Sequence, residues 1–402
     1  MGIGISKLAS AISCFTSKQV RVPSSLAGNQ DLVREILSKL PVKSLVRFRC
    51  VSKEWYALLN QEFILNINRN YLPNLCLLYG QNIVSGHHHH EFSLLGRKVD
   101  TLSRLEFTAS VLDDSVEKIY IVGSSNGLVC LHFLGDRTKT KSIIVWNPVT
   151  EQYRKLPKPL SFEWDKLTEP LVGFGFIQDH GMNSTDYKVV RISRSKGDIR
   201  LGLIGYVTQV FTRSAKSWRV VKECNPSRYL FYKQSSITLN GVLYSLAWTR
   251  TGVNMAYSVF SFNLQDEVFH NIQLPQSSTI SVGRLFVWNN LVAYSTWADH
   301  SCQYDVWVMT TESRDDTQMP TNWNWTKQVT IKPPIRWYYG PPSGVWNDQF
   351  IFYKGHTHSK RGSELYLYTY DLADQKERML LGPETDYCCL QVVDYVESLV
   401  PV

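Results

Sequence analysis

The most restrictive feature of this 402-residue sequence is a pair of motifs that repeats along its last three quarters. The first motif is a turn followed by an apolar run, as at Asn126-Gly127, Asn240-Gly241, Asn289-Asn290 and Asn347-Asp348. The second is a strand, an Asn or Asp turn and another strand that ends in leucine, as in VWNPVTEQYRKLP, SFNLQDEVFHNIQLP and TYDLADQKERMLL. Such turns between apolar runs of strand length are typical of antiparallel hairpins. The pattern predicts short strands from about residue 75 onward.

The spacing of the first motif suggests how these strands are grouped. Its copies lie 114, 49 and 58 residues apart. If the longest gap holds two units, one unit has roughly 50–57 residues, which is typical of the four-stranded blade of a β-propeller. We count five units and expect a sixth, formed by residues 75–120 together with the C-terminal strand LQVVDYV, because pairing both ends of the chain removes an exposed edge. An irregular β-sandwich is the alternative.

Residues 31–65 follow a helical pattern instead. Asp31 is a candidate N-cap for apolar positions that step by three and four, and Ser44 and Ser52 are candidate caps for two further short helices. In LPVKSLVRFRCVSKEW the apolar side chains fall on more than one side of each short helix, so each helix needs a partner on two faces. The expected fold class is therefore α+β, with a small N-terminal three-helix domain before an all-β, propeller-like domain.

Charge and cysteine content narrow the classes of partner. Residues 1–70 hold ten Lys and Arg against four Asp and Glu, which leaves only +2 of the net charge of +8 for the rest of the chain. The basic character is thus local, and we expect no nucleic-acid partner. The eight cysteines form no CxxC pair, so we expect neither a zinc site nor a disulfide framework, and a cytoplasmic or nuclear location.

Two stretches resemble a known family. DLVREILSKLPVKSLVRFRCVSKEWYALLNQEFI, residues 31–64, closely resembles the F-box of plant F-box proteins. GSSNGLVCL, IIVWNPVTEQYRKLP, GFGF and DYKVVRI resemble the F-box-associated domain that follows it, which occurs in S-locus F-box-like and kelch-like members. The resemblance covers roughly residues 30–390 and implies a flexible tail over residues 1–25, an F-box over 26–70 and a β-propeller-like domain over 75–396. The double glycine of true kelch repeats is absent, so the likeness to kelch proteins concerns architecture alone.

The resemblance also implies a function. In this family the F-box binds the Skp adaptor, and through it the cullin, of an Skp–cullin–F-box ubiquitin ligase, while the β domain binds the protein to be ubiquitinated. The chain is then a non-catalytic substrate-recognition subunit without a cofactor. A helical cap without a partner is the alternative for the helices. The residues that match the positions meeting the adaptor, or holding the helices beneath it, are Leu32, Ile36, Leu37, Leu40, Pro41, Leu45, Phe48, Val51 and Trp55.

One departure from the family pattern supports a second function. Members usually open the F-box with Leu-Pro and acidic residues, whereas this chain has Gly28, Asn29 and Gln30 there, and VPSSL stands a few residues earlier. A weakened start to the F-box would suit an interaction scaffold, tethered to a membrane, that has lost ligase assembly. The intact LPVKSLVRFRCVSKEW block favours the ligase subunit.

The N-terminus MGIGISKLASAISCFTSK is a candidate lipid anchor. Gly2 stands where N-myristoylation requires glycine, and Ser6 follows at the expected position. One myristoyl chain binds a bilayer weakly, so nearby cations, an apolar stripe or palmitoylation of Cys14 would have to add to it. The sequence therefore predicts peripheral membrane contact. A plain flexible tail and a transit peptide are the alternatives.

Three other segments carry further predictions. We expect the histidines at 87–90, and His356 with His358, to lie in solvated polar loops without a metal, because no cysteine or carboxylate cluster stands beside them. No catalytic motif is present, so we expect no enzyme. An aromatic loop is the candidate contact with the target protein, because Trp, Tyr and Arg dominate binding hot spots, although packing between blades would explain it equally well; its residues are Arg336, Trp337, Tyr338 and Tyr339.

Overall fold

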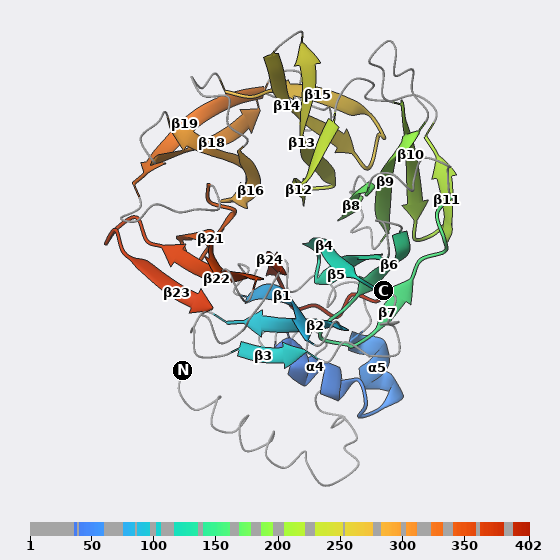
Figure 1. Cartoon of the computed structure of the whole chain (residues 1–402). Helices are drawn as coiled ribbons and strands as arrows, with labels where there is room; N and C mark the ends of the chain where they lie inside the picture. The colour runs from blue at the N-terminus through green and yellow to red at the C-terminus, as the bar shows by residue number, and fades with distance from the viewer. Residues whose placement is uncertain are drawn as a thin grey trace.

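The computed structural model shows a ring of six four-stranded antiparallel sheets with two short helices against one side (Figure 1). It describes residues 36–37, 40–59, 75–84, 87–96, 102–105, 116–135, 140–160, 169–177, 186–195, 205–221, 230–251, 254–275, 283–298, 303–311, 323–332, 341–358, 362–381 and 389–402. The expectation of a propeller-like β domain is therefore confirmed, and the alternative of an irregular sandwich is wrong.

Each sheet is one blade, with its strands ordered from the centre of the ring outward. The first three blades are β24 (Cys389–Tyr395), β1 (Leu75–Val84), β2 (His87–Leu95) and β3 (Leu102–Leu105); β4 (Lys118–Ser125), β5 (Leu128–Leu134), β6 (Thr140–Trp146) and β7 (Tyr153–Lys155); β8 (Leu171–Phe176), β9 (Tyr187–Ser195), β10 (Gly205–Thr212) and β11 (Ser217–Val220). The other three are β12 (Leu230–Leu239), β13 (Val242–Thr251), β14 (Asn254–Asn263) and β15 (Phe269–Gln273); β16 (Arg284–Trp288), β17 (Leu291–Ala298), β18 (Gln303–Thr311) and β19 (Trp323–Ile331); β20 (Gly344–Trp346), β21 (Gln349–His358), β22 (Gly362–Tyr370) and β23 (Glu377–Leu381).

The repeated turns make tight hairpins between the first two strands of four blades. Both residues of each turn have positive φ, for example 49° at Asn126 and 76° at Gly127, and 49° at Asn240 and 73° at Gly241. Positive φ at both central residues is the type I′ geometry, whose twist matches that of the flanking strands. Asn and Gly tolerate this backbone better than other residues, which explains why they recur here.

The second motif forms the turn between the last two strands of a blade. Asn147 Oδ1 accepts hydrogen bonds from the backbone N–H groups of Val149 and Thr150, at 3.0 and 3.2 Å. Asn263 and Asp371 use the same oxygen in the same way in two other blades. The side chain thus replaces a backbone acceptor and fixes the turn, as Asx residues do.

Apolar side chains between neighbouring blades hold the ring together. Six separate clusters of buried residues each join two adjacent blades, so all six interfaces are filled. Large members include Phe92, Tyr187, Tyr304 and Phe352. Because each interface buries mainly apolar side chains, the blades stabilise one another in the manner of a repeat protein.

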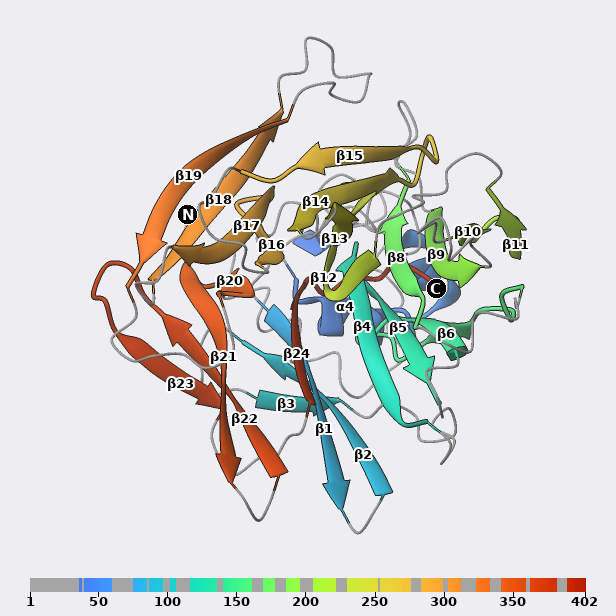
Figure 2. The same ribbon diagram turned by 45° about the horizontal axis from the view of Figure 1, so that its top comes forward.

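The ring closes through strands from opposite ends of the chain, as the sequence predicts. β24 pairs antiparallel with β1 from Leu75 opposite Tyr395 to Gln81 opposite Cys389, and Figure 2 shows the two strands side by side. Gln391 also holds β24 against the neighbouring blade, because its side-chain amide donates to Ile119 O and accepts from Ile121 N, at 2.7 and 2.9 Å. This blade, which the two ends of the chain form, ends at β3, however, and residues 118–120 belong to the next blade.

The helical domain is only partly as expected. Among the described residues two helices are present, α4 (Val42–Phe48) and α5 (Lys53–Leu59), so a three-helix domain is not confirmed. Ser52 caps α5 by accepting from Trp55 N at 3.3 Å, as predicted. The prediction for Ser44 is wrong, because Pro41 is the N-cap of α4 and Ser44 lies inside the helix. Proline pre-sets a backbone suited to a helix start without any side-chain bond.

The histidine-rich segments are strands rather than loops. Residues 87–90 begin β2 and pair with residues 81–84 of β1. His356 and His358 lie in β21, opposite Glu364 and Gly362 of β22. The prediction failed because backbone pairing with a partner strand, which side-chain polarity does not reveal, decides the conformation here. In the part of the chain that the structure describes, no group of three potential metal-ligating residues gathers.

Candidate functional site

The helical domain completes its core with a residue from the far end of the chain. Its cluster contains four buried residues of the domain, Leu37, Val42, Leu45 and Leu59, and also Leu399, which is 1% exposed. The rings of Phe48 and Trp55, 5.5 Å apart, pack against the cluster. Seven-residue helices are marginal on their own in water, so this shared core is what keeps them folded.

Residues 396–402, which we name the C-terminal segment, run between the helices and the second blade. Asn147, which is fully buried, donates through Nδ2 to Ser398 O at 3.0 Å and to Val400 O at 2.9 Å. Ser398 Oγ in turn donates to Asn126 O at 2.7 Å, and Arg154 Nη2 donates to Val402 O at 2.9 Å. One residue of the repeated motif therefore both builds its turn and binds the C-terminal segment.

The same segment is bonded to the helices. Arg49, which follows α4, donates through Nη2 to Leu399 O at 3.1 Å. Burial lowers the pKa of Arg49 and raises the pKa of Glu397, which the charge of Lys43 partly offsets. The side chains of Leu399 and Val400 point to different partners, since Leu399 joins the helical core and Val400 the core between the second and third blades. The C-terminal segment thus fixes the helical domain on one face of the propeller.

The helical domain leaves three apolar side chains in solvent, outside its core. Val51 is 41% exposed and Tyr56 is 57% exposed, and Pro41 at the start of α4 is exposed as well. Exposed cations lie on the same two short helices, at Lys43, Arg47 and Lys53. Large apolar side chains left in solvent among charged residues are typical of a protein-binding surface.

The residues predicted to meet an adaptor divide between the core of the helical domain and its exposed side chains. Leu37 and Leu45 are buried in the helical core, and Ile36, Leu40, Phe48 and Trp55 are half-buried. Pro41 and Val51 are exposed. Val51 therefore does not lock α5 from within, as the sequence suggested. Tyr56, which sequence reasoning passed over, is the largest exposed apolar side chain in the described part of the helices.

Other predicted site residues lie outside the described part of the chain. These are Gly2 and Cys14 at the candidate lipid anchor, Leu32 in the first expected helix, and Arg336, Trp337, Tyr338 and Tyr339 in the aromatic loop. None of the described helices is long and apolar enough to span a bilayer.

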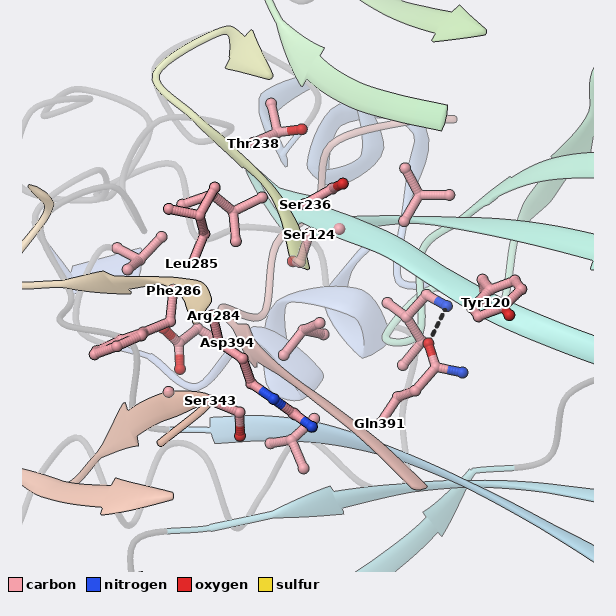
Figure 3. Close-up of a pocket in the computed structure, with 18 of the residues that line it drawn as sticks. Tyr120, Ser124, Ser236, Thr238, Arg284, Leu285, Phe286, Ser343, Gln391 and Asp394 are labelled. Atoms are coloured by element: carbon pink, nitrogen blue, oxygen red, sulfur yellow. Dashed lines mark hydrogen bonds between the residues drawn. The ribbon is translucent and has the colours of Figure 1, made fainter. Parts of the chain in front are cut away.

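A second candidate site is a cavity of about 670 Å³ along the axis of the ring (Figure 3). The inner strands of all six blades line it, namely β24, β4, β8, β12, β16 and β20. Serine and threonine hydroxyls from several blades face it beside apolar side chains, as at Ser124, Ser236 and Ser343. Its size and mixed lining suit a bound ligand or peptide segment rather than packed core.

Three side chains that carry a charge at neutral pH line this cavity, namely Lys118, Arg284 and Asp394. The Lys118 Nζ lies 4.4 Å from the centre of the Tyr120 ring, and the Arg284 guanidinium lies 5.6 Å from that of Tyr353. Asp394 is exposed to the solvent inside the cavity, and the protein around it reduces its hydration and raises the pKa of its carboxyl group to about 6. Burial lowers the pKa of Arg284, whereas the nearby Tyr353 raises it.

With this geometry in view, the family relationship is clear. Residues 83–379 match the family described as F-box associated beta propeller domain, which alone is more than half of the chain. The chain belongs to that family. Residues 29–65 match the F-box domain and include α4 and α5. The identification of a plant-type F-box protein from its motifs is therefore confirmed, and the two matches include no enzymatic domain.

Relatives of this F-box protein come from Arabidopsis thaliana. The F-box protein At3g10240 is 30% identical over 253 residues, which are 61% of this chain but only 59% of that relative. The F-box protein At3g07870 is 30% identical over 305 residues, 70% of this chain and 69% of its own. The F-box/kelch-repeat protein At3g23880 is 24% identical over 347 residues, 79% and 82% of the two chains. A solved acylaminoacyl peptidase from Pyrococcus horikoshii overlays with a TM-score of 0.37 at 11% identity, covering 77% of this chain and 51% of its own, which is too distant to inform function.

Proposed function

We propose that this F-box protein is the substrate-recognition subunit of an Skp–cullin–F-box ubiquitin ligase. Its F-box binds the Skp adaptor, and through it the cullin, and its propeller binds the protein to be ubiquitinated. The observation that supports this most is the division of the F-box into two surfaces. One surface is bonded to the propeller through the C-terminal segment, and the other leaves Val51 and Tyr56 in solvent. An F-box held in this way has one surface free for an adaptor while the propeller is displayed.

The topology suggests which face of the propeller receives the target. In each of five blades the first two strands are joined on one face of the ring, the face where Asn126 meets the C-terminal segment and the F-box. Because the strands alternate in direction, the outer strand of each blade ends, and the inner strand of the next blade begins, on the opposite face. β19 ends and β20 begins there, and in the sequence Arg336 and Trp337, which lie outside the described residues, stand between these two strands. We assign target binding to this face, away from the F-box.

Adaptor binding tests the proposal. The double variant Val51→Ala and Tyr56→Ala should weaken binding of the Skp adaptor at least about tenfold, because truncated hot-spot side chains cost about 1–2 kcal/mol each. The matched control replaces Val220 and Tyr153 of the propeller by alanine, since these are 41% and 40% exposed. Binding is measured by calorimetry with purified adaptor. A wild-type chain that does not bind the adaptor would refute the proposal.

The location of the receptor is a separate proposal. We propose that the protein works in the cytoplasm or nucleus, and that myristoylation of Gly2, with palmitoylation of Cys14, adds peripheral membrane contact. Gly2→Ala should then release the protein from the membrane fraction, and Cys14→Ser should release part of it. An unmodified N-terminal mass in a wild-type protein that stays in the soluble fraction would contradict the membrane contact and leave the ligase proposal intact.

A further inference from the structure

The central cavity offers a built site on the propeller that the family relationship does not assign. It extends along the inner strands, because residues near both ends of two of them line it, namely Lys118 and Ser124 of β4 and Leu390 and Asp394 of β24. Its volume of about 670 Å³ falls within the range of ligand sites, roughly 300–1,000 Å³. A cavity of this kind takes a small ligand or a short stretch of extended chain.

The charges of the cavity are separated along its length. Lys118 and Arg284 are the first residues of β4 and β16, and inner strands begin on the face away from the F-box. Asp394 lies near the end of β24, and β24 leads directly into the C-terminal segment on the F-box face. Among the side chains that line the cavity, both cations therefore lie at the end that faces away from the F-box, which we call the cationic end, and Asp394 lies at the end that faces the F-box. Glu169, which binds the hydroxyl of Tyr120, does not line the cavity.

The two cations stand opposite each other. β4 and β16 are three blades apart in a ring of six, so their side chains approach the axis from opposite sides. The Arg284 side chain extends into the cavity (Figure 3). A group that reaches the axis at this end lies between a guanidinium and an ammonium group, which both favour an anion.

Aromatic rings hold both cations in position. Lys118 lies over Tyr120, whose hydroxyl donates to Glu169 Oε2 at 3.0 Å and so fixes the ring. Arg284 lies over Tyr353. A cation that already rests on an aromatic face loses little side-chain freedom when it binds an anion. Partial burial also strips hydration from Arg284, so an anionic partner stabilises it more than it would on the surface.

We propose that this cationic end of the cavity binds an extended acidic segment of the target protein, with a carboxylate or phosphate group between Arg284 and Lys118. The inference rests on the proposed function, because it takes the propeller as the part that binds the target. Asp394 at the other end repels the anion and keeps it at the end that faces away from the F-box. The segment therefore enters from the face opposite the F-box and its adaptor.

The test uses the full chain and labelled peptides of one framework. The three probes are hexapeptides that carry glutamates, phosphoserines or glutamines, and binding is followed by fluorescence anisotropy. Arg284→Gln should weaken binding of the anionic probes about tenfold, Lys118→Gln should weaken it by a smaller factor, and Arg284→Lys should restore part of it. The control is Lys216→Gln, an equal change of charge at an exposed turn on the F-box face, which should leave binding within twofold. Thermal unfolding shows that each variant is folded.

The outcomes separate the possible sources of the anion. Tighter binding of the phosphoserine probe assigns the site to a phosphorylated segment, and tighter binding of the glutamate probe assigns it to an acidic one. The proposal is overturned if the glutamine probe binds as tightly as the anionic probes, or if both cavity variants bind like Lys216→Gln. Adaptor binding by these variants is measured in parallel, so that failure here stays distinct from failure of the ligase proposal.

Discussion

The propeller and the F-box of this protein depend on different sources of stability. The propeller fills each of its six blade interfaces with its own buried side chains and closes its ring by pairing β24 with β1. The described helices of the F-box are seven residues long, and their small core needs Leu399 from outside the domain. The difference shows that the F-box is stabilised by the propeller, whereas the propeller's blades need nothing from the F-box.

Under the proposed function, the arrangement has a consequence for ubiquitin transfer. An F-box bonded to the propeller through the C-terminal segment would hold the adaptor at a constant orientation to the proposed target-binding face. A ubiquitin ligase must bring a lysine of its target close to the site of ubiquitin transfer. A fixed orientation between the F-box and the propeller limits the positions that this lysine can reach. Loosening the C-terminal segment should therefore affect ubiquitination more than it affects adaptor or target binding alone.

Removing the strand that closes the ring should have the largest effect. A chain that ends at residue 388 lacks β24 and the C-terminal segment, so β1 becomes an open edge and the interfaces that contain Leu390 and Tyr395 are emptied. We expect a loss of more than about 5 kcal/mol of unfolding free energy, or aggregation, because several large buried residues go at once. Chemical denaturation measures it.

A chain that ends at residue 395 is the control for that deletion. It keeps β24 and loses only the C-terminal segment, so its propeller should unfold cooperatively with a smaller loss of stability. Equal stability of the chain that ends at residue 388 and the full chain would show that β24 does not close the ring.

The double role of Asn147 predicts an intermediate effect. Asn147→Asp keeps the oxygen that builds the turn but replaces the donor to Ser398 O and Val400 O by a second oxygen, which places a buried carboxylate against two carbonyl groups. We expect a loss of about 3 kcal/mol or more. The matched change Asn263→Asp should cost less, because Asn263 makes the same turn without contacting the C-terminal segment, and its Nδ2 donates to Asp266, an exposed side chain that can turn away from a new carboxylate. Asp371 already occupies the equivalent turn in another blade, which shows that a carboxylate fits this backbone.

Two equivalent turn glycines provide a finer comparison. Gly127 and Gly241 have nearly the same backbone, with φ of 76° and 73°, but a Cβ at Gly127 would collide with Ser398 and come within 2.7 Å of Val396 O. A Cβ at Gly241 would come within 3.0 Å of Phe176 O. Alanine at either position should lower the free energy of unfolding by about 1–2 kcal/mol, because a residue with a Cβ is strained at positive φ.

The collision should add about 1–2 kcal/mol at Gly127 alone. Thermal or denaturant unfolding of Gly127→Ala and of Gly241→Ala measures the difference between their losses of stability. This difference should vanish when each single change is made in the chain that ends at residue 395. If the difference persists in that shortened chain, contact with the C-terminal segment is not its cause.

Much of the ring could be predicted from the sequence, because the conformation of its turns depends on the residues within each turn. Type I′ turns need Asn or Gly, and the Asx turns need a short side-chain acceptor, so both leave a mark in the sequence at Asn240-Gly241 and Asn263. The closing strand could be predicted because a propeller must remove its open edge. The histidine-rich start of β2 could not, since its conformation comes from pairing with residues 81–84 of β1.

The docking of the F-box on the propeller left a weaker signal. Leu399 and Val400 follow the last predicted strand without any pattern that says which core each enters, and only the fold brings them to the F-box and to the blade interface. The sequence showed only that apolar residues continue beyond the closing strand, which indicates that they are buried somewhere in the fold. The central cavity was equally hidden, because Lys118, Arg284 and Asp394 are distant in sequence and meet only when the ring closes.

Hydrogen exchange in the two F-box helices tests most directly whether the propeller completes the F-box core. Leu399→Ala empties the site in the F-box core, and the neighbouring Val400→Ala is its control, because that side chain packs between blades. The account predicts that Leu399→Ala speeds exchange of the amides of α4 and α5 at least about tenfold, since about 2–5 kcal/mol is lost when a buried leucine is truncated, while β4 to β7 keep their protection. Val400→Ala should leave α4 and α5 protected. Unchanged exchange of α4 and α5 in Leu399→Ala would contradict the account.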